Sequence, residues 1–121
     1  ANDAGDYLIG GKIRVGGGSL RNMIKPSSDG ASADCWYSGV GNLDVHYSSG
    51  VANHFFFLLA EGTNSAYGTS PTCVSGNTRV ATGTGSLVQQ GRANSWSMAN
   101  IAAWAWRRAF TRPGNRNPRP W

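Results

Sequence analysis

Residues 44–62 read DVHYSSGVANHFFFLLAEG and carry the strongest helical signal in the chain. Apolar side chains recur there at i, i+4, i+7 and i+8, which is one face of a helix, namely Val51, Phe55, Leu58 and Leu59. The serines before Gly50 can cap the first turn, and Gly62 can end the last one. The sequence therefore predicts a helix over 49–62, and its apolar content predicts that this helix is mostly buried.

Both histidines of the chain, His46 and His54, lie in this stretch. His54 falls on the side opposite the Val51, Phe55 and Leu58 face, so a structural role is expected for it. His46 precedes the helix, and taken alone it is interpreted as a loop histidine bonded to backbone groups. The two are eight residues apart without a carboxylate at ligand spacing, which argues against a helical two-histidine metal site. No GxSxG motif is present, so a serine nucleophile is not indicated either.

The chain has 121 residues, of which 40% are hydrophobic, 14% are charged and 17 are glycine. This length fits one small domain, and the glycine content predicts long loops. The longest apolar run, residues 55–60, is far shorter than the ~18 residues of a membrane-spanning helix. A small domain without a membrane partner is therefore expected.

The net charge of +5 is unevenly placed. Residues 92–121 hold six of the 11 Lys and Arg and none of the six acids, so they carry +6 and the rest of the chain carries five minus six, or −1. Four of the five tryptophans lie in the same segment. Such a segment suits nucleic acid or anionic surfaces, through charge and stacking. The sequence favours the plainer interpretation, a solvated tail whose last ~10 residues are disordered.

Cys35 and Cys73 are the two cysteines. An even count in a small, glycine-rich chain favours a disulfide and an exported protein over two free buried thiols. There is no CxxC motif, and the histidines are not at zinc-finger spacing. A zinc site built from these cysteines is therefore not expected.

Shorter elements are predicted around the helix. Extended segments are expected near 7–9 and 12–15, one helical turn at 19–24 and one strand at 78–81. Residues 93–110 are alanine-rich and suit a second helix, although their alternation of Trp and Ala suits a strand as well.

Three motifs, in order, resemble the thermolysin-like zinc metalloendopeptidases, the neutral proteases of bacilli and actinomycetes. DVHYSSGVANHFFFLLAEG resembles the region around the family's catalytic histidine, ANDAGDYLIGGKI the segment after its third-ligand helix, and SLRNMIKPS its Leu-Arg-x-Met segment. CWYSG and SPTC resemble the secreted actinomycete branch, in which two cysteines pair, here Cys35 and Cys73. The resemblance covers about residues 1–85 and fades from about Ser86.

The resemblance implies a mainly α fold, the helical C-terminal lobe of the thermolysin-like fold, with long glycine-rich loops and little strand. It implies that His46 donates a hydrogen bond to the oxyanion of the tetrahedral intermediate, where charge develops only in the transition state. Arg21 would bind the substrate carbonyl beyond the scissile bond, and Leu20 would line the pocket for the apolar side chain that follows it. Without the resemblance, Arg21 and Leu20 would be interpreted as a solvated arginine and a core leucine.

The family's zinc ligands, its glutamate base and the tyrosine partner of its histidine have no counterpart in this sequence. The resemblance therefore implies a secreted peptidase that attacks peptide or protein substrates with a zinc-bound water. This chain would form one wall of its active-site cleft. A missing N-terminal lobe would hold the zinc, and the chain alone is expected to be inactive.

Two further departures concern acidic residues. The family orients its histidine with an aspartate five residues earlier, where this chain has Gly41. Asp44, in a stretch expected to be irregular or extended, would replace that aspartate only loosely. Of the acids in the family's calcium site, only Asp6 remains, and the others are replaced by Leu8, Gly11 and Lys12. The sequence therefore gives no support for calcium.

The sequence divides into a partial thermolysin-like lobe, residues 1–91, and a divergent Trp- and Arg-rich segment, residues 92–121. A frameshift, an unrelated fused end and true divergence would each produce this change, and the sequence leaves them open. The competing functional hypothesis is a non-catalytic binding module that kept the scaffold. Such a module would use residues 92–121 to bind nucleic acid or anionic surfaces.

Overall fold

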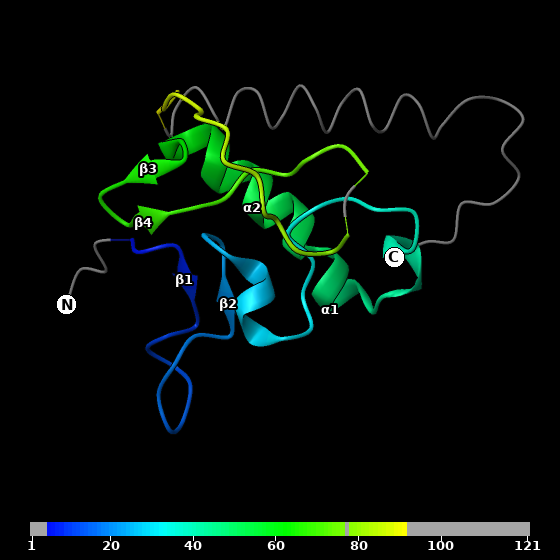
Figure 1. The fold of residues 1–121 in the computed structure, drawn as a ribbon. Coiled ribbons are helices and arrows are strands. Elements are labelled where there is room, and N and C mark those ends of the chain that lie inside the picture. The colour runs from blue at the N-terminus through cyan, green and yellow to red at the C-terminus, as the bar shows by residue number, and fades with distance from the viewer. Residues whose placement is uncertain (1–4, 77, 92–121) are drawn as a thin grey trace, which may run out of the picture.

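The computed structural model describes residues 5–76 and 78–91 (Figure 1). Its elements follow in the order β1 (Leu8–Ile9), β2 (Arg21–Asn22), η1 (Pro26–Asp29), η2 (Val40–Asn42), α1 (Val45–Ser48), α2 (Gly50–Glu61), β3 (Asn64–Ser65) and β4 (Gly68–Thr69). Each strand is two residues long, and β1 pairs antiparallel with β2 as β3 does with β4. The fold is mainly α, as predicted, with α2 as its longest element and loops around it (Figure 1).

Helix α2 confirms the predicted helix over 49–62, with observed bounds of Gly50–Glu61. Ser49 precedes it with helical dihedral angles, since the same residue also ends α1. Its side chain makes no capping hydrogen bond to α2 and donates instead to His46 O. At the other end, Gly62 has a φ of 78° and donates its N–H to Leu58 O. Glycine takes this left-handed conformation without strain, so the helix ends there.

Residues 87–91 fold back over the C-terminal end of α2. Gln90 N donates to Leu59 O at 3.2 Å, and Gly91 N donates to Ala60 O at 3.1 Å. Carbonyl groups in the last turn of a helix have no partner within the helix itself. The returning chain therefore supplies hydrogen bonds that α2 cannot make internally.

The predicted buried face of α2 is only partly right. Leu58 is buried as predicted, but Phe55, assigned to the core, is 51% exposed, whereas His54, assigned to the other side, is 1% exposed and Phe57 is 0% exposed. The run FFFLLA is apolar on every side of a helix, so periodicity alone could not single out one face. The core face is the one on which His54 and Glu61 find polar partners. Phe57 packs there edge-on against Tyr7, with ring centroids 4.9 Å apart.

Asp34 joins the segments that surround α2. Its buried carboxylate accepts hydrogen bonds from Ser27 N at 2.7 Å, Ser27 Oγ at 2.8 Å and Ala81 N at 3.0 Å. Its backbone N–H donates to Arg79 O at 2.9 Å, and its carbonyl accepts from His54 Nδ1 at 3.0 Å. A buried charge is tolerated when its oxygens are hydrogen-bonded in this way. Segments far apart in sequence therefore meet at one side chain.

The loop that leads into Cys35 lies against the start of α2. A Cβ on Gly50 would lie 2.4 Å from Ala33 O and 3.0 Å from Pro26 Cβ, so the site has room for glycine alone. Cys35 forms a disulfide with Cys73, with a Cα–Cα distance of 5.8 Å, which confirms the predicted pairing.

Strand β1 confirms the extended segment predicted near 7–9, but three other short predictions are wrong. Residues 12–15 form a turn, which three successive glycines complete at 16–18 with φ of 91°, 80° and 77°. Residues 19–24 contain β2 instead of a helical turn, since pairing with β1 outweighs local preference. Residues 78–81 form no strand. The carbonyl oxygen of Arg79 instead accepts hydrogen bonds from both Asp34 N and Cys35 N.

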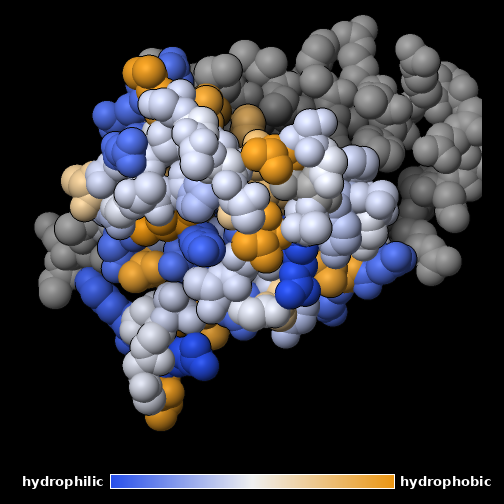
Figure 2. Space-filling view, viewed as in Figure 1, coloured by the Kyte–Doolittle hydropathy of each residue, from blue (hydrophilic) through white to orange (hydrophobic). Residues whose placement is uncertain are grey.

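On the face shown in Figure 2, the apolar side chains of the described residues lie in small separate groups. One group is at the tip of the loop between β1 and β2, where Ile13 and Val15 are 78% and 99% exposed. Within the described ranges, no helix combines the length and the apolar character needed to cross a membrane. The helix or strand predicted over 93–110, and the whole tail segment, lie outside the described residues.

Candidate functional site

Arg21 and His46 come together although they are 25 residues apart in sequence. Arg21 lies in β2 and His46 in α1, and the Nε of Arg21 donates to His46 O at 3.1 Å. Arg21 Nη1 also donates to Leu20 O at 2.6 Å, and the guanidinium lies 5.9 Å from the centroid of the Tyr47 ring. These contacts hold the guanidinium of Arg21 against α1.

Asp44 contacts His46 directly, which corrects the expectation of a loose arrangement. The stretch before α2 is not extended at this point, because Asp44 is the N-cap of α1. One oxygen, Oδ1, accepts from His46 N at 2.8 Å and lies 2.6 Å from His46 Nδ1. An N-cap side chain accepts from an N–H of the first helical turn, so capping brings the carboxylate to the base of the histidine ring.

The pKa of Asp44 is lowered from its ordinary value by its contacts with His46. The hydrogen bond from the His46 backbone N–H is the largest cause, followed by the contact with the ring and, last, by the charge of Arg21. These contacts favour the ionised carboxylate and outweigh the opposing effect of desolvation. Asp44 is therefore the anionic member of a pair whose side chains are 59% exposed for Asp44 and 72% for His46.

Leu20 lies beside Arg21 at the end of the loop that joins β1 to β2. It is 47% exposed, so it is not a core leucine. Its side chain covers Gly10, since a Cβ on Gly10 would lie 2.8 Å from Leu20 Cδ1. The position that corresponds to the family's orienting aspartate, Gly41, faces open space, with nothing within 4 Å of an added Cβ.

His54 is separate from this group of residues. It is buried in the core, where Nδ1 contacts Asp34 O at 3.0 Å and Nε2 contacts Ser70 Oγ at 2.7 Å. The hydroxyl of Ser70 also lies 2.6 Å from Ile24 O. Both ring nitrogens are therefore engaged inside the protein and do not face a ligand.

One group of side chains has the composition of a metal site, namely Cys35, His54 and Cys73, whose donor atoms lie within 4.8 Å of one another. Zinc binds thiolates, however, and the two sulfurs here are joined in the disulfide. Among the residues that the structure describes, this group does not fit zinc.

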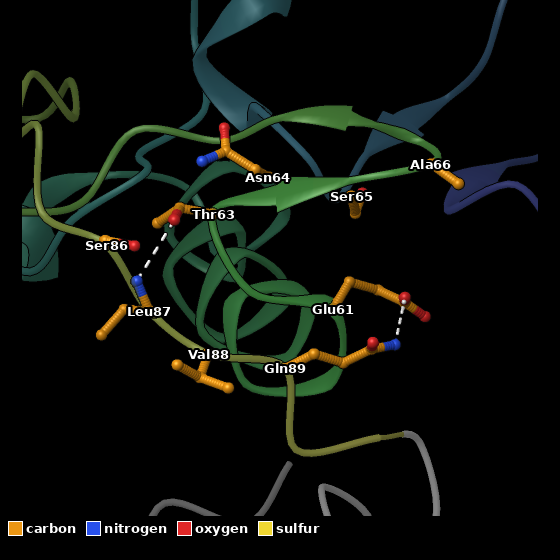
Figure 3. A pocket seen from close by; sticks show the side chains of 9 residues that line it. All are labelled: Glu61, Thr63, Asn64, Ser65, Ala66, Ser86, Leu87, Val88 and Gln89. Carbon is orange, nitrogen blue, oxygen red and sulfur yellow. Dashed lines mark hydrogen bonds between the residues drawn. The ribbon is translucent and has the colours of Figure 1, made fainter.

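Glu61, the last residue of α2, lines a polar cavity of about 380 Å³ between the β3–β4 hairpin and residues 86–89 (Figure 3). Its carboxylate accepts from Tyr7 Oη at 2.5 Å and from Gln89 Nε2 at 3.0 Å. These bonds tie the two ends of the described chain to the end of α2. The sequence signal that could have indicated this site is the position of Glu61, a charged residue between the apolar run 55–60 and Gly62.

A family model described as the thermolysin metallopeptidase alpha-helical domain matches residues 1–111. The chain therefore belongs to the thermolysin-like zinc metallopeptidases, as its motifs had indicated, and represents part of their helical domain. No solved structure matches the chain.

Three curated relatives show how much of a whole enzyme this chain covers. The transglutaminase-activating metalloprotease of Streptomyces mobaraensis is 64% identical over 63 residues, which is 50% of this chain and 8% of the relative. The zinc metalloproteinase MspA of Legionella longbeachae is 55% identical over 64 residues, 48% of this chain and 12% of the relative. The neutral protease of Vibrio proteolyticus is 46% identical over 55 residues, 46% of this chain and 9% of the relative. The matched part thus spans about a tenth of each relative's length.

Proposed function

We propose that this chain forms the substrate-facing part of the C-terminal lobe of a thermolysin-like zinc metalloendopeptidase. In this role His46 stabilises the oxyanion of the tetrahedral intermediate, and Arg21 binds the substrate carbonyl beyond the scissile bond. The observation that carries the proposal is the hydrogen bond from Arg21 Nε to His46 O. It joins the two residues that the family resemblance selects independently.

The ring of His46 is suited to a ligand on its outer side. Nδ1 is engaged by Asp44, and Nε2 has no hydrogen-bond partner within residues 5–76 and 78–91. A donor that meets charge formed only in the transition state lowers the barrier, typically by about 2.7–4 kcal/mol for one hydrogen bond. An exposed imidazole on a short helix can supply such a donor.

Arg21 keeps donors available for a substrate. A guanidinium has five N–H groups, and within the described residues two of them bind the carbonyls of His46 and Leu20, which leaves three without an acceptor there. The two backbone bonds fix the plane of the group, which reduces the entropy lost when a carbonyl binds. Leu20, adjacent and half exposed, is proposed to contact the apolar side chain that follows the cleaved bond.

The chain is proposed to be inactive by itself and to act with a zinc-binding lobe on peptide or protein substrates. The support is that the matched part spans only 8%, 12% and 9% of the length of the three metalloprotease relatives. An extracellular location is proposed as well, because disulfides such as Cys35–Cys73 form and persist in oxidising compartments. The division into residues 1–91 and 92–121 remains a proposal about domain organisation.

The first test asks whether the isolated chain cleaves peptides. We expect no cleavage of a casein or furylacryloyl-peptide substrate by the pure 121-residue chain, with or without added zinc. Cleavage that a chelator abolishes would contradict the proposed dependence on another lobe.

The second test places the residues in a working enzyme. Residues 5–91 replace the matching segment of the Streptomyces mobaraensis metalloprotease, and the active chimera is then substituted. His46→Ala is expected to lower kcat by about 10²-fold or more with little change in KM, whereas Arg21→Ala should raise KM. Arg14→Ala is the matched control, because the one hydrogen bond of Arg14 within the described residues is to Ser19 O in its own loop. An unchanged kcat for His46→Ala would reject the oxyanion role.

A further inference from the structure

The disulfide and the buried histidine of α2 lie at one place in the fold. Among the described residues, Cys35, His54 and Cys73 form a group whose sulfur and ring nitrogen atoms lie within 4.8 Å of one another. The two cysteines are 38 residues apart in sequence, and His54 lies between them on α2. Three separate segments therefore supply one donor each, which is why no spacing motif indicates the group.

We propose that these three side chains bind one zinc ion when the Cys35–Cys73 disulfide is reduced, so that the chain holds either the disulfide or the metal. A dithiol supplies the two electrons and two protons that convert the disulfide into two thiols, and is itself oxidised to a disulfide. Zn²⁺ then replaces the two thiol protons, which are released to solvent. The site is independent of the role proposed for His46.

The donor types and their spacing match what zinc requires. Zinc binds thiolate sulfur at about 2.3 Å and imidazole nitrogen at about 2.0–2.1 Å, so two of its ligand atoms are at most about 4.6 Å apart. The three donors already lie within 4.8 Å of one another. After reduction the two sulfurs must separate to about 3.8 Å, the distance between two sulfurs of a tetrahedral site. Cys73 is exposed, so its side chain has room to turn, whereas Cys35 and His54 are buried and stay in place.

Hydrogen bonds hold the two cysteine segments together without the disulfide. Cys35 N donates to Arg79 O at 3.3 Å, which fixes the first segment. Next to Cys73, Thr72 N donates to Gly83 O at 3.1 Å and Gly83 N donates back to Thr72 O at 2.6 Å. Reduction breaks none of these bonds, so both thiols remain close to α2.

His54 has one ring nitrogen on the side of the sulfurs and a partner for the other nitrogen. Asp34 O lies 3.0 Å from His54 Nδ1 and 3.8 Å from Cys73 Sγ, so Nδ1 is the nitrogen on the disulfide side. Nε2 lies 2.7 Å from Ser70 Oγ, whose hydroxyl donates to Ile24 O at 2.6 Å. A zinc ion on Nδ1 replaces the hydrogen that faces Asp34 O and keeps the bond from Nε2 to Ser70. Metal-binding histidines ordinarily have such a partner on the second nitrogen.

The fourth position of the ion faces a cavity of about 450 Å³ that all three side chains line. Trp36 and Phe55 form part of its apolar wall, and both are more than half exposed. Because Cys73 is exposed as well, solvent reaches this position. A water molecule completes the tetrahedron in zinc sites that have three protein ligands.

The test is titration of the 121-residue chain with Co²⁺ and then Zn²⁺, before and after reduction. The reductant is a phosphine, which takes an oxygen atom from water, leaves two thiols and avoids the metal binding of a dithiol. In the reduced chain we expect Co²⁺ to give the charge-transfer absorption of thiolate ligands and the visible bands of a tetrahedral site. One Zn²⁺ per chain should displace it. The oxidised chain should show neither signal.

Substitutions identify the ligands. Cys73→Ser should abolish the tetrahedral Co²⁺ spectrum, and Ser70→Ala should weaken zinc binding by about 10–100-fold through loss of the partner of Nε2. His46→Ala is the matched control, because His46 is the other histidine of the chain and lies outside the group. This variant should bind zinc like wild type. The comparison of oxidised and reduced wild type needs no substitution, so it decides even where a variant does not fold.

A second measurement tests the competition between metal and disulfide. Zinc should slow the re-formation of the disulfide by oxidised glutathione at least tenfold, because the metal occupies both sulfurs. An unchanged rate would contradict the mutual exclusion.

Three further results would overturn the proposal. They are a reduced wild-type chain without thiolate absorption in Co²⁺, a zinc affinity that is equal before and after reduction, and an affinity that urea unfolding leaves unchanged. The last would show that two thiols suffice without the fold. None of these results bears on the oxyanion role, which the chimera tests separately.

Discussion

Aspartate side chains in this chain serve the backbone more than they serve ion pairs. Asp6, Asp29 and Asp44 each accept from the N–H two residues further on, which shapes a local turn. Asp34 makes distant contacts instead and is buried. The same residue type therefore shapes turns at the surface and connects segments in the core.

Replacing Asp34 with asparagine should destabilise the protein. Ser27 N donates to Oδ1, while Ala81 N and Ser27 Oγ donate to Oδ2. An amide nitrogen in either place would face an N–H donor, and a buried unsatisfied group costs about 1–3 kcal/mol. Urea unfolding should show a loss of that size for Asp34→Asn. Asp29→Asn, at an exposed turn, should change stability much less, and equal losses would contradict a special role for Asp34.

Because the pKa of Asp44 is lowered in the folded state, part of the free energy of unfolding depends on pH. A carboxyl whose pKa is lower in the folded state stabilises the fold above its unfolded value of about 3.8. That contribution is lost as the pH falls through the folded-state pKa. Wild type should therefore exceed Asp44→Asn in unfolding free energy near neutral pH, and the difference should shrink as the pH falls below about 3.8. A difference that is constant with pH would show that the carboxylate charge plays no part.

At the scale of single elements, the sequence predicted the existence of α2 but not its orientation. Length, apolar content and Gly62 sufficed for the helix. The buried face depended on Asp34 and Tyr7, which bind His54 and Glu61 from distant parts of the chain. Such partners leave no mark on local periodicity, so burial of a histidine could not be foreseen.

Gly50→Ala should destabilise α2 even though alanine is the better helix former. The added Cβ would lie 2.4 Å from Ala33 O, and backbone there cannot move without disturbing the loop. Overpacking of this kind costs about 1–3 kcal/mol, which exceeds the gain of about 1 kcal/mol in helix propensity. Thermal unfolding should show the loss. The matched substitution Gly41→Ala, with nothing within 4 Å, should be nearly neutral.

For the candidate site, resemblance supplied the residues and the structure supplied their contacts. Nothing in the spacing of Arg21 and His46 predicts that they meet, because pairing of β1 with β2 sets the place of Arg21. The contact of Asp44 was underestimated, since α1 is only four residues long and lacks a periodic signal. A helix this short is recognised in a sequence mainly by its capping residue. Here the N-cap, Asp44, is also the side chain that contacts the ring of His46.

At the scale of the whole molecule, the disulfide compensates for a small core. Cys35 and Cys73 are 38 residues apart, and closing a loop of that length stabilises the folded state by about 4 kcal/mol on the chain-entropy account. We expect dithiothreitol to lower the midpoint of thermal unfolding by many degrees. A midpoint that does not change on complete reduction would mean that the core alone holds the fold.

The ring closed by Cys35 and Cys73 also determines what happens when the chain is cut. Helices α1 and α2 lie inside that ring, with His46 among them, while Leu20 and Arg21 lie outside it. Exposed loops are the preferred sites at which a protease cuts a folded chain. One nick between the two cysteines leaves both pieces covalently joined, so the fragment that carries His46 stays attached until a reductant arrives.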